Sequence, residues 1–413
     1  IVPNKFPRYV PSKRLAIVGE APGADEEQTG EPFVGSSGRL LRFMLGSVGY
    51  SADQCFLGNV CQLRPPSNDI ENFPFDGPEI QSGLEVLRKD LETFQPNCVL
   101  ALGRTAFRAL NPDVCYFNDR GTLQIPLSNW RGSVFKSPWG YKSIATFHPA
   151  YILRAYSDSG LFRFDVARAV NQAAYPELRL RARTFTTRPS LDEVLTFLND
   201  VLTNQRTIAF DIEGVCDNVG VTMVSFFTSP DQGIVIPFWL QGTHYWSHGD
   251  ECTIWAAIAA VLTSPLVRKI TQNGLYELFV LQWKHKIVVH NIADDTMLKH
   301  WELFPEFEKS LAVQTSLYTL EPYYKDDRES TNPETRLVYN AKDSAVTFEC
   351  SIEQDGLLAK QPKSSDHYRF NISLLPSLNY MALRGVRLDL DRLALKKSVV
   401  TTEIDSLQAQ VDS

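Results

Sequence analysis

Residues 15–41 read LAIVGEAPGADEEQTGEPFVGSSGRLL, and this stretch decides the fold of the front half of the chain. The apolar run at 15–19 has the length and composition of a buried strand. Glycines in the following loop permit positive φ and close approach of backbone N–H groups to a ligand, whereas the two prolines stiffen it. We therefore predict a strand, then a rigid loop that presents Glu20 and Phe33, and then a helix.

The same alternation continues down the chain. Apolar runs at 98–103 and 143–147 alternate with helical patterns at 79–94 and 105–110. Strands separated by helices are typical of an α/β domain with a largely parallel sheet covered by crossover helices. In such sheets ligands bind beyond the carboxyl ends of the strands.

Polar side chains stand at three of these strand ends. Glu20 follows the first run, Asn59 ends the run before a double-proline loop, and His148 follows the run at 143–147. With Phe33 they form a set suited to a planar heterocycle. We expect Phe33 to stack on the base and Asn59 to bind its edge. His148 then faces an oxygen that gains charge, and Glu20 orients water.

Four motifs carry a resemblance to a known family. GEAPG, GEPFVG, NV-x-x-x-RPP and HPAYILR occur in the order and spacing of the uracil-DNA glycosylase superfamily, most closely its family 4, over roughly residues 12–170. The resemblance implies that Glu20 is the catalytic acid, that Phe33 and Asn59 bind uracil, and that His148 stabilises the departing uracil anion.

The resemblance also implies further contacts with the substrate. Gly19 and Ala21 flank Glu20 and are expected to bind substrate with it. The loop at 149–154 is expected to enter the DNA, with Tyr151 and Arg154 as binding side chains.

The chain departs from family 4 at the cysteines. That family holds an iron–sulfur cluster on four cysteines, but no cysteine precedes Cys55, and Leu63 and Gly83 stand at the third and fourth ligand positions. We predict no iron–sulfur cluster, because the thiolate ligands are missing. A domain that has changed in this way either excises uracil or serves as a non-catalytic module that binds uracil or DNA.

The second half opens with TIAFDIEG at 207–214. Side chains at i and i+2 of a strand share a face, so Asp211 and Glu213 emerge together. Adjacent carboxylates repel each other unless a cation lies between them, and Mg²⁺ or Mn²⁺ is the natural occupant. Apolar runs at 221–229 and 233–239 follow at hairpin spacing, which predicts the start of a ribonuclease H-like mixed sheet.

Two further motifs add polar side chains. QNGLYEL places Asn273 and Glu277 four residues apart, and YNAKDSAV does the same for Tyr339 and Asp343. On a helix, such pairs share a face. Four carboxylates and a tyrosine can therefore gather around two metal ions, although each motif alone is more often a strand edge or an exposed helix face.

The layout of residues 183–357 resembles the proofreading 3′-to-5′ exonuclease of family A DNA polymerases. That resemblance implies two-metal hydrolysis of the 3′-terminal phosphodiester, with Tyr339 orienting water and Asn273 binding substrate. The expected metal ligands are Asp211, Glu213, Glu277 and Asp343. The family usually has Asp where Glu277 stands, so the second motif differs from its pattern.

The last segment, with an Arg-Gly-Val turn between two helical patterns, resembles the opening of the polymerase region of family A enzymes. We therefore expect three parts: a glycosylase-like domain at 1–175, an exonuclease domain at 176–360, and the first thumb helices at 361–413. The whole resembles the front part of a bacteriophage DNA polymerase, an enzyme of DNA replication and repair.

Composition sets limits on the partners of the chain. With 44% apolar and 22% charged residues and a net charge of −7, it is typical of a globular protein outside membranes. DNA, as single strands and primer–template ends, is the expected partner and is contacted through local positive patches. Replication proteins are possible further partners. We expect a monomer in the cytoplasm of the cell, or of the host cell if the gene is phage-borne.

Overall fold

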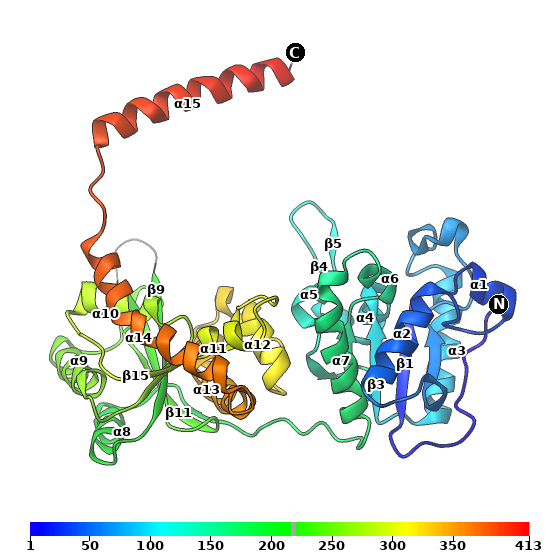
Figure 1. Ribbon diagram of the computed structural model, residues 1–413, viewed down its shortest axis with the longest axis horizontal. Helices are drawn as coiled ribbons and strands as arrows, with labels where there is room; N and C mark the ends of the chain where they lie inside the picture. The colour runs from blue at the N-terminus through cyan, green and yellow to red at the C-terminus, as the bar shows by residue number, and fades with distance from the viewer. Residues whose placement is uncertain (216–219, 413) are drawn as a thin grey trace.

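The computed structural model describes residues 1–215 and 220–412. Two domains lie side by side, and a long terminal helix projects from the second one (Figure 1). Within the described residues, every helix is too short or too polar to cross a membrane.

The first domain is built on a five-stranded sheet in the order β2-β1-β3-β7-β6. Four strands are parallel and fully buried: β1 (Leu15–Gly19), β2 (Phe56–Asn59), β3 (Cys98–Leu102) and β7 (Lys142–Thr146). The fifth, β6 (Val134–Lys136), pairs antiparallel with β7 at one edge. The predicted parallel α/β domain is therefore confirmed.

Helices cover both faces of this sheet, because alternate strand residues point to opposite sides. Leu15 and Ile17 pack in one core layer, and Ala16 and Val18 pack in the other. The first layer contains α2 (Ser36–Ser47) and α7 (Ser159–Gln172). The second contains α3 (Pro78–Phe94) and α4 (Gly103–Leu110). The smaller elements are α1 (Ala24–Thr29), α5 (Leu127–Trp130), α6 (Pro149–Ile152), β4 (Tyr116–Phe117) and β5 (Leu123–Gln124).

The second domain has a six-stranded sheet in the order β15-β14-β9-β10-β11-β8. Read from β11, five of these strands lie in the order β11-β10-β9-β14-β15, which is 3-2-1-4-5 when they are numbered along the chain. Of these five strands, β10 alone runs antiparallel to the others. This is the ribonuclease H-like arrangement that the sequence predicted. The strands are β8 (Thr184–Thr186), β9 (Ile208–Val215), β10 (Gly220–Phe227), β11 (Gln232–Pro237), β14 (Lys269–Thr271) and β15 (Ile292–Asp295).

Helices pack on both faces of the second sheet as well. One face carries α8 (Leu191–Thr203), α9 (His248–Thr263) and α10 (Leu275–His285). The other face carries α13 (Pro333–Leu358), which brings Leu337, Ala341 and Ala345 against the strands. The remaining elements are α11 (Thr296–Leu303), α12 (Leu311–Tyr318), and the hairpin of β12 (Trp239–Leu240) and β13 (Thr243–His244).

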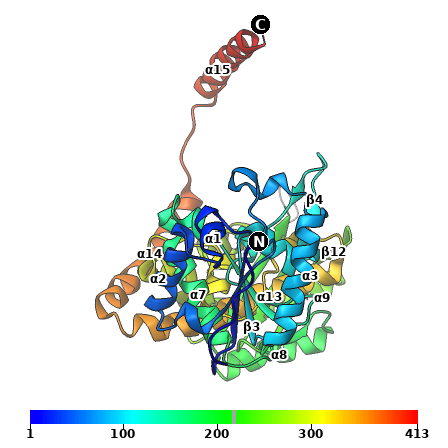
Figure 2. The ribbon, with the colours of Figure 1, turned by 90° about the vertical axis from the view of Figure 1, so that its right-hand side faces the viewer.

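The C-terminal segment consists of two helices joined by residues 385–389. Helix α14 (Pro362–Arg384) packs against α10 and α11, so it lies on the second domain. Gly385 ends it with a φ of 64°, in the region that favours glycine. Helix α15 (Leu390–Val411), all of which the structure describes, has no buried residue and stands apart from both domains (Figure 2). The predicted boundary at residue 360 stays a prediction.

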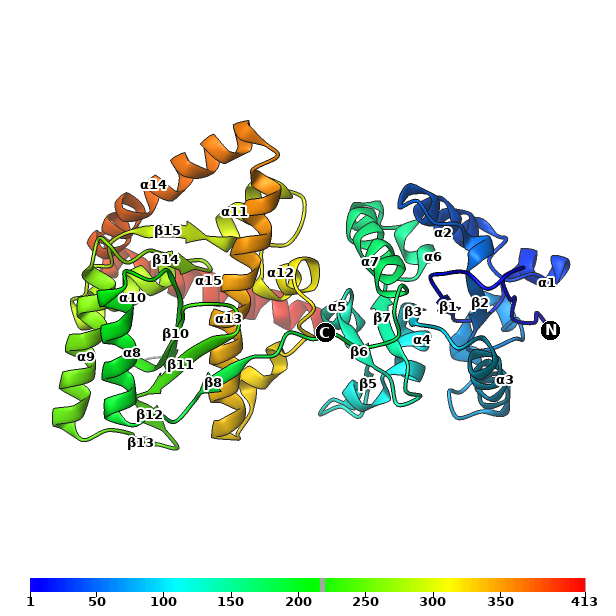
Figure 3. The ribbon, with the colours of Figure 1, turned by 90° about the horizontal axis from the view of Figure 1, so that it is seen from below.

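The two domains contact each other through α7 and α12. Arg168 donates hydrogen bonds to the carbonyl oxygens of Leu317 at 2.9 Å and Thr319 at 2.7 Å. The ring of Trp130 in α5 lies 5.8 Å from that of Tyr323, between ring centroids. Figure 3 shows α12 on the side of the second domain that faces α5 and α7. The segment after α12 is thus held by the first domain.

Candidate functional site

A cavity of about 970 Å³ opens at the carboxyl edge of the first sheet. Glu20, Phe33, Asn59 and His148 all line it, so side chains separated by up to 128 positions meet at one place. Other predicted residues on its wall are Ala21, Tyr151 and Arg154. The predicted Gly19 is not among the residues that line the cavity, but a Cβ atom at this position would stand 2.6 Å from Asn59 Oδ1 and 2.8 Å from Phe33 Cζ. A larger residue there would displace both side chains.

The loop that carries Phe33 is braced by Glu26, which the sequence reasoning missed. The Glu26 carboxylate accepts hydrogen bonds from the backbone N–H groups of Val34 at 3.0 Å and Gly35 at 2.8 Å, and from Gly23 at 3.1 Å. It therefore ties together both ends of the loop. Its signal in the sequence is an acid three residues after the glycine that starts α1.

Phe33 itself needs a glycine nearby. Its φ of 56° is unusual for an aromatic residue. A Cβ at Gly38 would lie 2.0 Å from the Phe33 carbonyl oxygen, so only glycine lets α2 approach this closely. The glycines of the opening stretch are therefore partly explained by the position of one ring.

His148 is held as a neutral hydrogen-bond donor. The backbone N–H of Ala150 donates to His148 Nδ1 at 3.2 Å, which assigns the ring proton to Nε2. Burial, helped by the charge of Arg154, lowers the pKa of His148 to about 4. At neutral pH the imidazole is therefore uncharged and can donate from Nε2 to an oxygen in the cavity.

Glu20 and Asn59 are fixed in different ways. Thr105 Oγ1 donates a hydrogen bond to Glu20 Oε2 at 2.5 Å, and burial raises the pKa of Glu20. Thr105 was not predicted, although it lies in the first turn of α4, directly after the strand at 98–102. Asn59 is 5% exposed, and Gln62 Nε2 donates to its backbone oxygen at 2.8 Å. Among residues 1–215 and 220–412 its carboxamide has no hydrogen-bond partner, so it is available to a ligand.

The cysteines of this domain do not fit an iron–sulfur cluster. Cys55 and Cys98 are buried in the core layer of α2 and α7, whereas Cys61 is buried on the opposite face of the sheet. The fourth cysteine, Cys115, is half-buried in the segment after α4. Burial raises the pKa of all four thiols, that of Cys98 to about 12. Thiols that are separated and protonated in this way are core residues and not ligands of one cluster.

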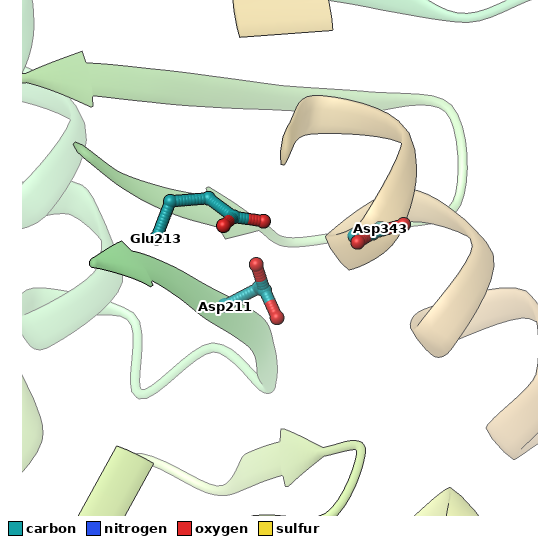
Figure 4. Close-up of side chains that lie close together, drawn as sticks. All are labelled: Asp211, Glu213 and Asp343. Atoms are coloured by element: carbon teal, nitrogen blue, oxygen red, sulfur yellow. The ribbon is translucent and has the colours of Figure 1, made fainter. Parts of the chain in front are cut away.

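A second group of polar side chains lies in the ribonuclease H-like domain. Asp211 and Glu213 on β9 face Asp343 on α13 across a short gap (Figure 4). One carboxylate oxygen from each lies within 4.8 Å of the other two. Burial and repulsion by Asp343 and Glu213 raise the pKa of Asp211 well above its ordinary value. A cation between these carboxylates would relieve the repulsion.

Glu277 stands next to this group but outside it. It is 4% exposed, and its Oε2 is buried without a hydrogen-bond partner among the described residues. Burial raises its pKa well above the ordinary value, with smaller contributions from Asp295 and Glu213. An unpartnered buried oxygen beside three clustered carboxylates fits a site for hard divalent cations.

The predicted pairing of Asn273 with Glu277 on one helix face is wrong. Helix α10 begins at Leu275, and Asn273 has a left-handed φ of 61° ahead of it. The reason is a distant carboxylate: Asp295 Oδ2 accepts a hydrogen bond from the N–H of Gly274 at 2.7 Å and fixes the start of the helix. Asn273 instead lines a separate cavity of about 230 Å³ with Asp295 and Trp301.

Three unpredicted side chains hold the acidic group. Asn340 Nδ2 donates to Asp211 Oδ2 at 2.7 Å, and Tyr324 Oη donates to Asp343 Oδ1 at 2.6 Å. Lys325 Nζ donates to both oxygens of Asp343 and to Tyr339 Oη. Tyr339 and Asp343 lie on the same face of α13, as their spacing predicted.

Comparisons with known proteins identify the first domain. Residues 6–174 match the model of the uracil DNA glycosylase superfamily. The type-4 uracil-DNA glycosylase of Archaeoglobus fulgidus is 36% identical over 153 residues, which are 35% of this chain and 72% of the relative. The type-4 enzyme of Thermotoga maritima is 34% identical over 146 residues, which are 35% of this chain and 69% of the relative.

One solved structure illustrates how distant the structural likenesses are. The POL domain of Pol1 from M. smegmatis, in complex with DNA primer-template and dNTP, has a TM-score of 0.40 and 17% identity. The alignment covers 54% of this chain and 36% of that one. The assignment of the second domain rests on its own strand order. The first domain, by contrast, is assigned by family, and through it the chain belongs to the uracil-DNA glycosylase superfamily.

Proposed function

We propose that the first domain binds uracil in DNA and hydrolyses its N-glycosidic bond. The observation that carries this proposal is the convergence of Glu20, Phe33, Asn59 and His148 on one cavity. In the reaction, the bond between the sugar carbon and the base nitrogen breaks, and the base leaves with the electron pair. Water then supplies the hydroxyl on the sugar and the proton on the base.

Two of these side chains can bind the base, and the other two can stabilise the charges that develop in the reaction. The ring of Phe33 offers a stacking surface, and the free carboxamide of Asn59 can bind the base edge. The Nε2–H of His148 can donate to the base oxygen that gains negative charge. The carboxylate of Glu20, positioned by Thr105, faces the positive charge that develops on the sugar and orients the attacking water.

The segment after His148 is the proposed DNA-entering loop. Tyr151 and Arg154 line the cavity, and the apolar side chain of Leu153 next to them is exposed. An apolar side chain beside the cavity mouth can fill the space that a flipped base leaves in the stack.

Alkali-labile sites in uracil-containing single-stranded DNA test the excision. We expect Glu20→Gln, Asn59→Ala and His148→Asn each to lower their formation by roughly a hundredfold or more, in line with loss of one electrostatic group. Asp211→Ala serves as the matched control and should leave excision intact. A first domain that only binds uracil would hold the substrate tightly and give no alkali-labile sites in any variant.

We also propose that the second domain removes nucleotides from DNA 3′ ends. Asp211, Glu213 and Asp343, with Glu277 beside them, are the proposed ligands of two ions, Mg²⁺ or Mn²⁺. Bound there, the ions would activate water and neutralise the charge on the leaving 3′ oxygen. The oxygen of water forms a bond to phosphorus as the bond from phosphorus to the 3′ oxygen of the preceding sugar breaks. That 3′ oxygen takes up a proton, and a nucleoside 5′-monophosphate is released.

The chain's own residues supply the rest of this site. Asn340 fixes the rotamer of Asp211, and Tyr324 fixes that of Asp343. Tyr339 lies one helical turn before Asp343, where its hydroxyl can orient the water. Asp211→Ala and Glu213→Ala should each abolish metal-dependent digestion of a 3′-labelled strand. Asp200 is an exposed acid on α8, and Asp200→Ala is the control, which should digest the strand like the wild type. Digestion that persists in both variants would refute this assignment.

We propose, finally, that both sites serve a family A DNA polymerase of bacteriophage type. The two helices α14 and α15 with their turn at Gly385 are compatible with the opening of such a polymerase region. Tethering raises the effective concentration of one site for DNA bound at the other to roughly millimolar. Primer extension by the chain in its natural full-length form tests this proposal, and failure to extend would contradict it.

A further inference from the structure

The segment between α12 and α13 brings a lysine into the acidic group. Lys325 begins a short 3₁₀ helix, Lys325–Glu329, and its side chain is 22% exposed. No sequence motif pointed to it. Its ammonium group is the one cation that contacts a carboxylate of the Asp211, Glu213 and Asp343 group among the described residues.

The contacts of Lys325 are close and use both oxygens of one carboxylate. Nζ donates to Asp343 Oδ1 at 2.6 Å and to Oδ2 at 2.7 Å, and also to Tyr339 Oη at 2.8 Å. Oδ1 also accepts from Tyr324. Charge-assisted hydrogen bonds of this length are among the strongest in proteins. Oδ1 already accepts two hydrogen bonds, so a metal ion that binds this oxygen must replace one of the donors. A metal ion that binds Oδ2 does so against the repulsion of the ammonium group on the same carboxylate.

The backbone around Lys325 is anchored, so the ammonium group stays near. Arg168 of the first domain holds the carbonyl oxygens of Leu317 and Thr319, at the start of the segment. Tyr323, two residues before Lys325, packs on Trp130 of the first domain. A tethered group competes with a free ion at a high effective concentration.

We propose that Lys325 is an internal cation that competes with divalent metal for Asp343 and so sets the metal affinity of the site. This inference rests on the proposed exonuclease function, because it requires that Asp343 bind metal. It makes Lys325 a positioning residue: without metal it holds Asp343 and Tyr339 in place, and with metal it moves off Asp343.

Mn²⁺ titration of the chelator-treated full chain by calorimetry tests the competition. Lys325→Met removes the ammonium group and keeps the apolar stem, so the dissociation constant should fall by roughly tenfold to a hundredfold. Lys325→Arg keeps the charge and the double contact and should bind Mn²⁺ like the wild type. Circular dichroism verifies that each variant is folded.

Arg328→Met is the matched control for charge alone. Arg328 lies near Glu213, which raises its pKa, but it makes no hydrogen bond with Asp343 among the described contacts. Its removal should change the Mn²⁺ affinity by less than about threefold. An equal gain in Mn²⁺ affinity in both Met variants, or no gain in Mn²⁺ affinity in Lys325→Met, would overturn the proposal. Absence of Mn²⁺ binding in the wild type and in every variant would overturn the metal site itself.

A measurement on the wild-type chain avoids any effect of substitution on folding. Acetylation of Lys325 by an amine reagent, followed by mass spectrometry, should become several-fold faster when Mn²⁺ is added. Lys342, which pairs with Glu321 at 3.0 Å, is the internal reference and should not change. An unchanged acetylation rate of Lys325 at saturating Mn²⁺ would contradict its release from Asp343.

Discussion

Acid should destabilise the first domain through His148. The pKa of this imidazole in the folded chain is about 4, below its ordinary value of 6.5, mainly because the ring is buried. The unfolded chain therefore takes up the proton first as the pH falls. Above pH 6.5 the titration of His148 does not change the free energy of unfolding. Between pH 6.5 and about 4 it lowers this free energy progressively as the pH falls.

The size of the effect follows from the two pKa values. A fall from 6.5 to about 4 corresponds to about 3 kcal/mol of unfolding free energy. The ring borders the cavity, and water there screens part of the charge, so we expect about 1–3 kcal/mol. Other buried histidines, such as His300, also have a lowered pKa and add to the pH dependence of stability. A control variant is therefore needed to isolate the contribution of His148.

His148→Asn is the matched variant, because its carboxamide oxygen can still accept the hydrogen bond from Ala150 and cannot titrate. Urea unfolding at several pH values should show the wild type losing more stability than the variant between pH 7 and 5. NMR of the imidazole should show a ring that titrates near pH 4 and carries its proton on Nε2 at pH 7. Titration near 6.5, or equal pH dependence in both proteins, would refute the reasoning.

Three further perturbations have defined outcomes. Gly38→Ala places a Cβ 2.0 Å from the Phe33 carbonyl and should abolish uracil excision in a glycosylase assay while 3′ digestion continues; retained excision would contradict the close approach. Arg168→Met leaves two carbonyl oxygens of the second domain without a donor and should cost about 1–3 kcal/mol in denaturant unfolding. It should also speed proteolysis of the 176–183 linker. Glu277→Gln removes a buried carboxyl group whose Oε2 has no hydrogen-bond partner among the described residues, and it should raise the melting temperature in EDTA while weakening Mn²⁺ binding. A higher melting temperature together with tighter Mn²⁺ binding would exclude Glu277 as a ligand.

Much of the fold could be predicted from local pattern. Short apolar runs at 15–19, 98–103 and 143–147 became strands of a parallel sheet because each is bounded by turn residues and followed by a helical pattern. Parallel strands place all their carboxyl ends at one edge. Polar residues after three such runs therefore had to meet, which is why the first cavity could be assembled from sequence.

The features that could not be predicted from the sequence depend on contacts between residues that are distant in the chain. Thr105 reaches Glu20 across 85 residues, and no periodicity records such a contact. The start of α10 is set by Asp295, so helical spacing alone placed Asn273 wrongly. Lys325 lies in a segment without apolar periodicity, where the direction of a long side chain is decided by the carboxylate it meets.

The central claim is that the first cavity hydrolyses the bond between uracil and the sugar. Its most direct test is free-base release from a uracil-containing single-stranded oligonucleotide, incubated with the full chain in EDTA and resolved by chromatography. Metal-dependent digestion is silent under these conditions. We expect free uracil from the wild type in an amount equal to the abasic sites formed, and none from Glu20→Gln. Tight binding of the oligonucleotide by the wild type without any free uracil would contradict the account.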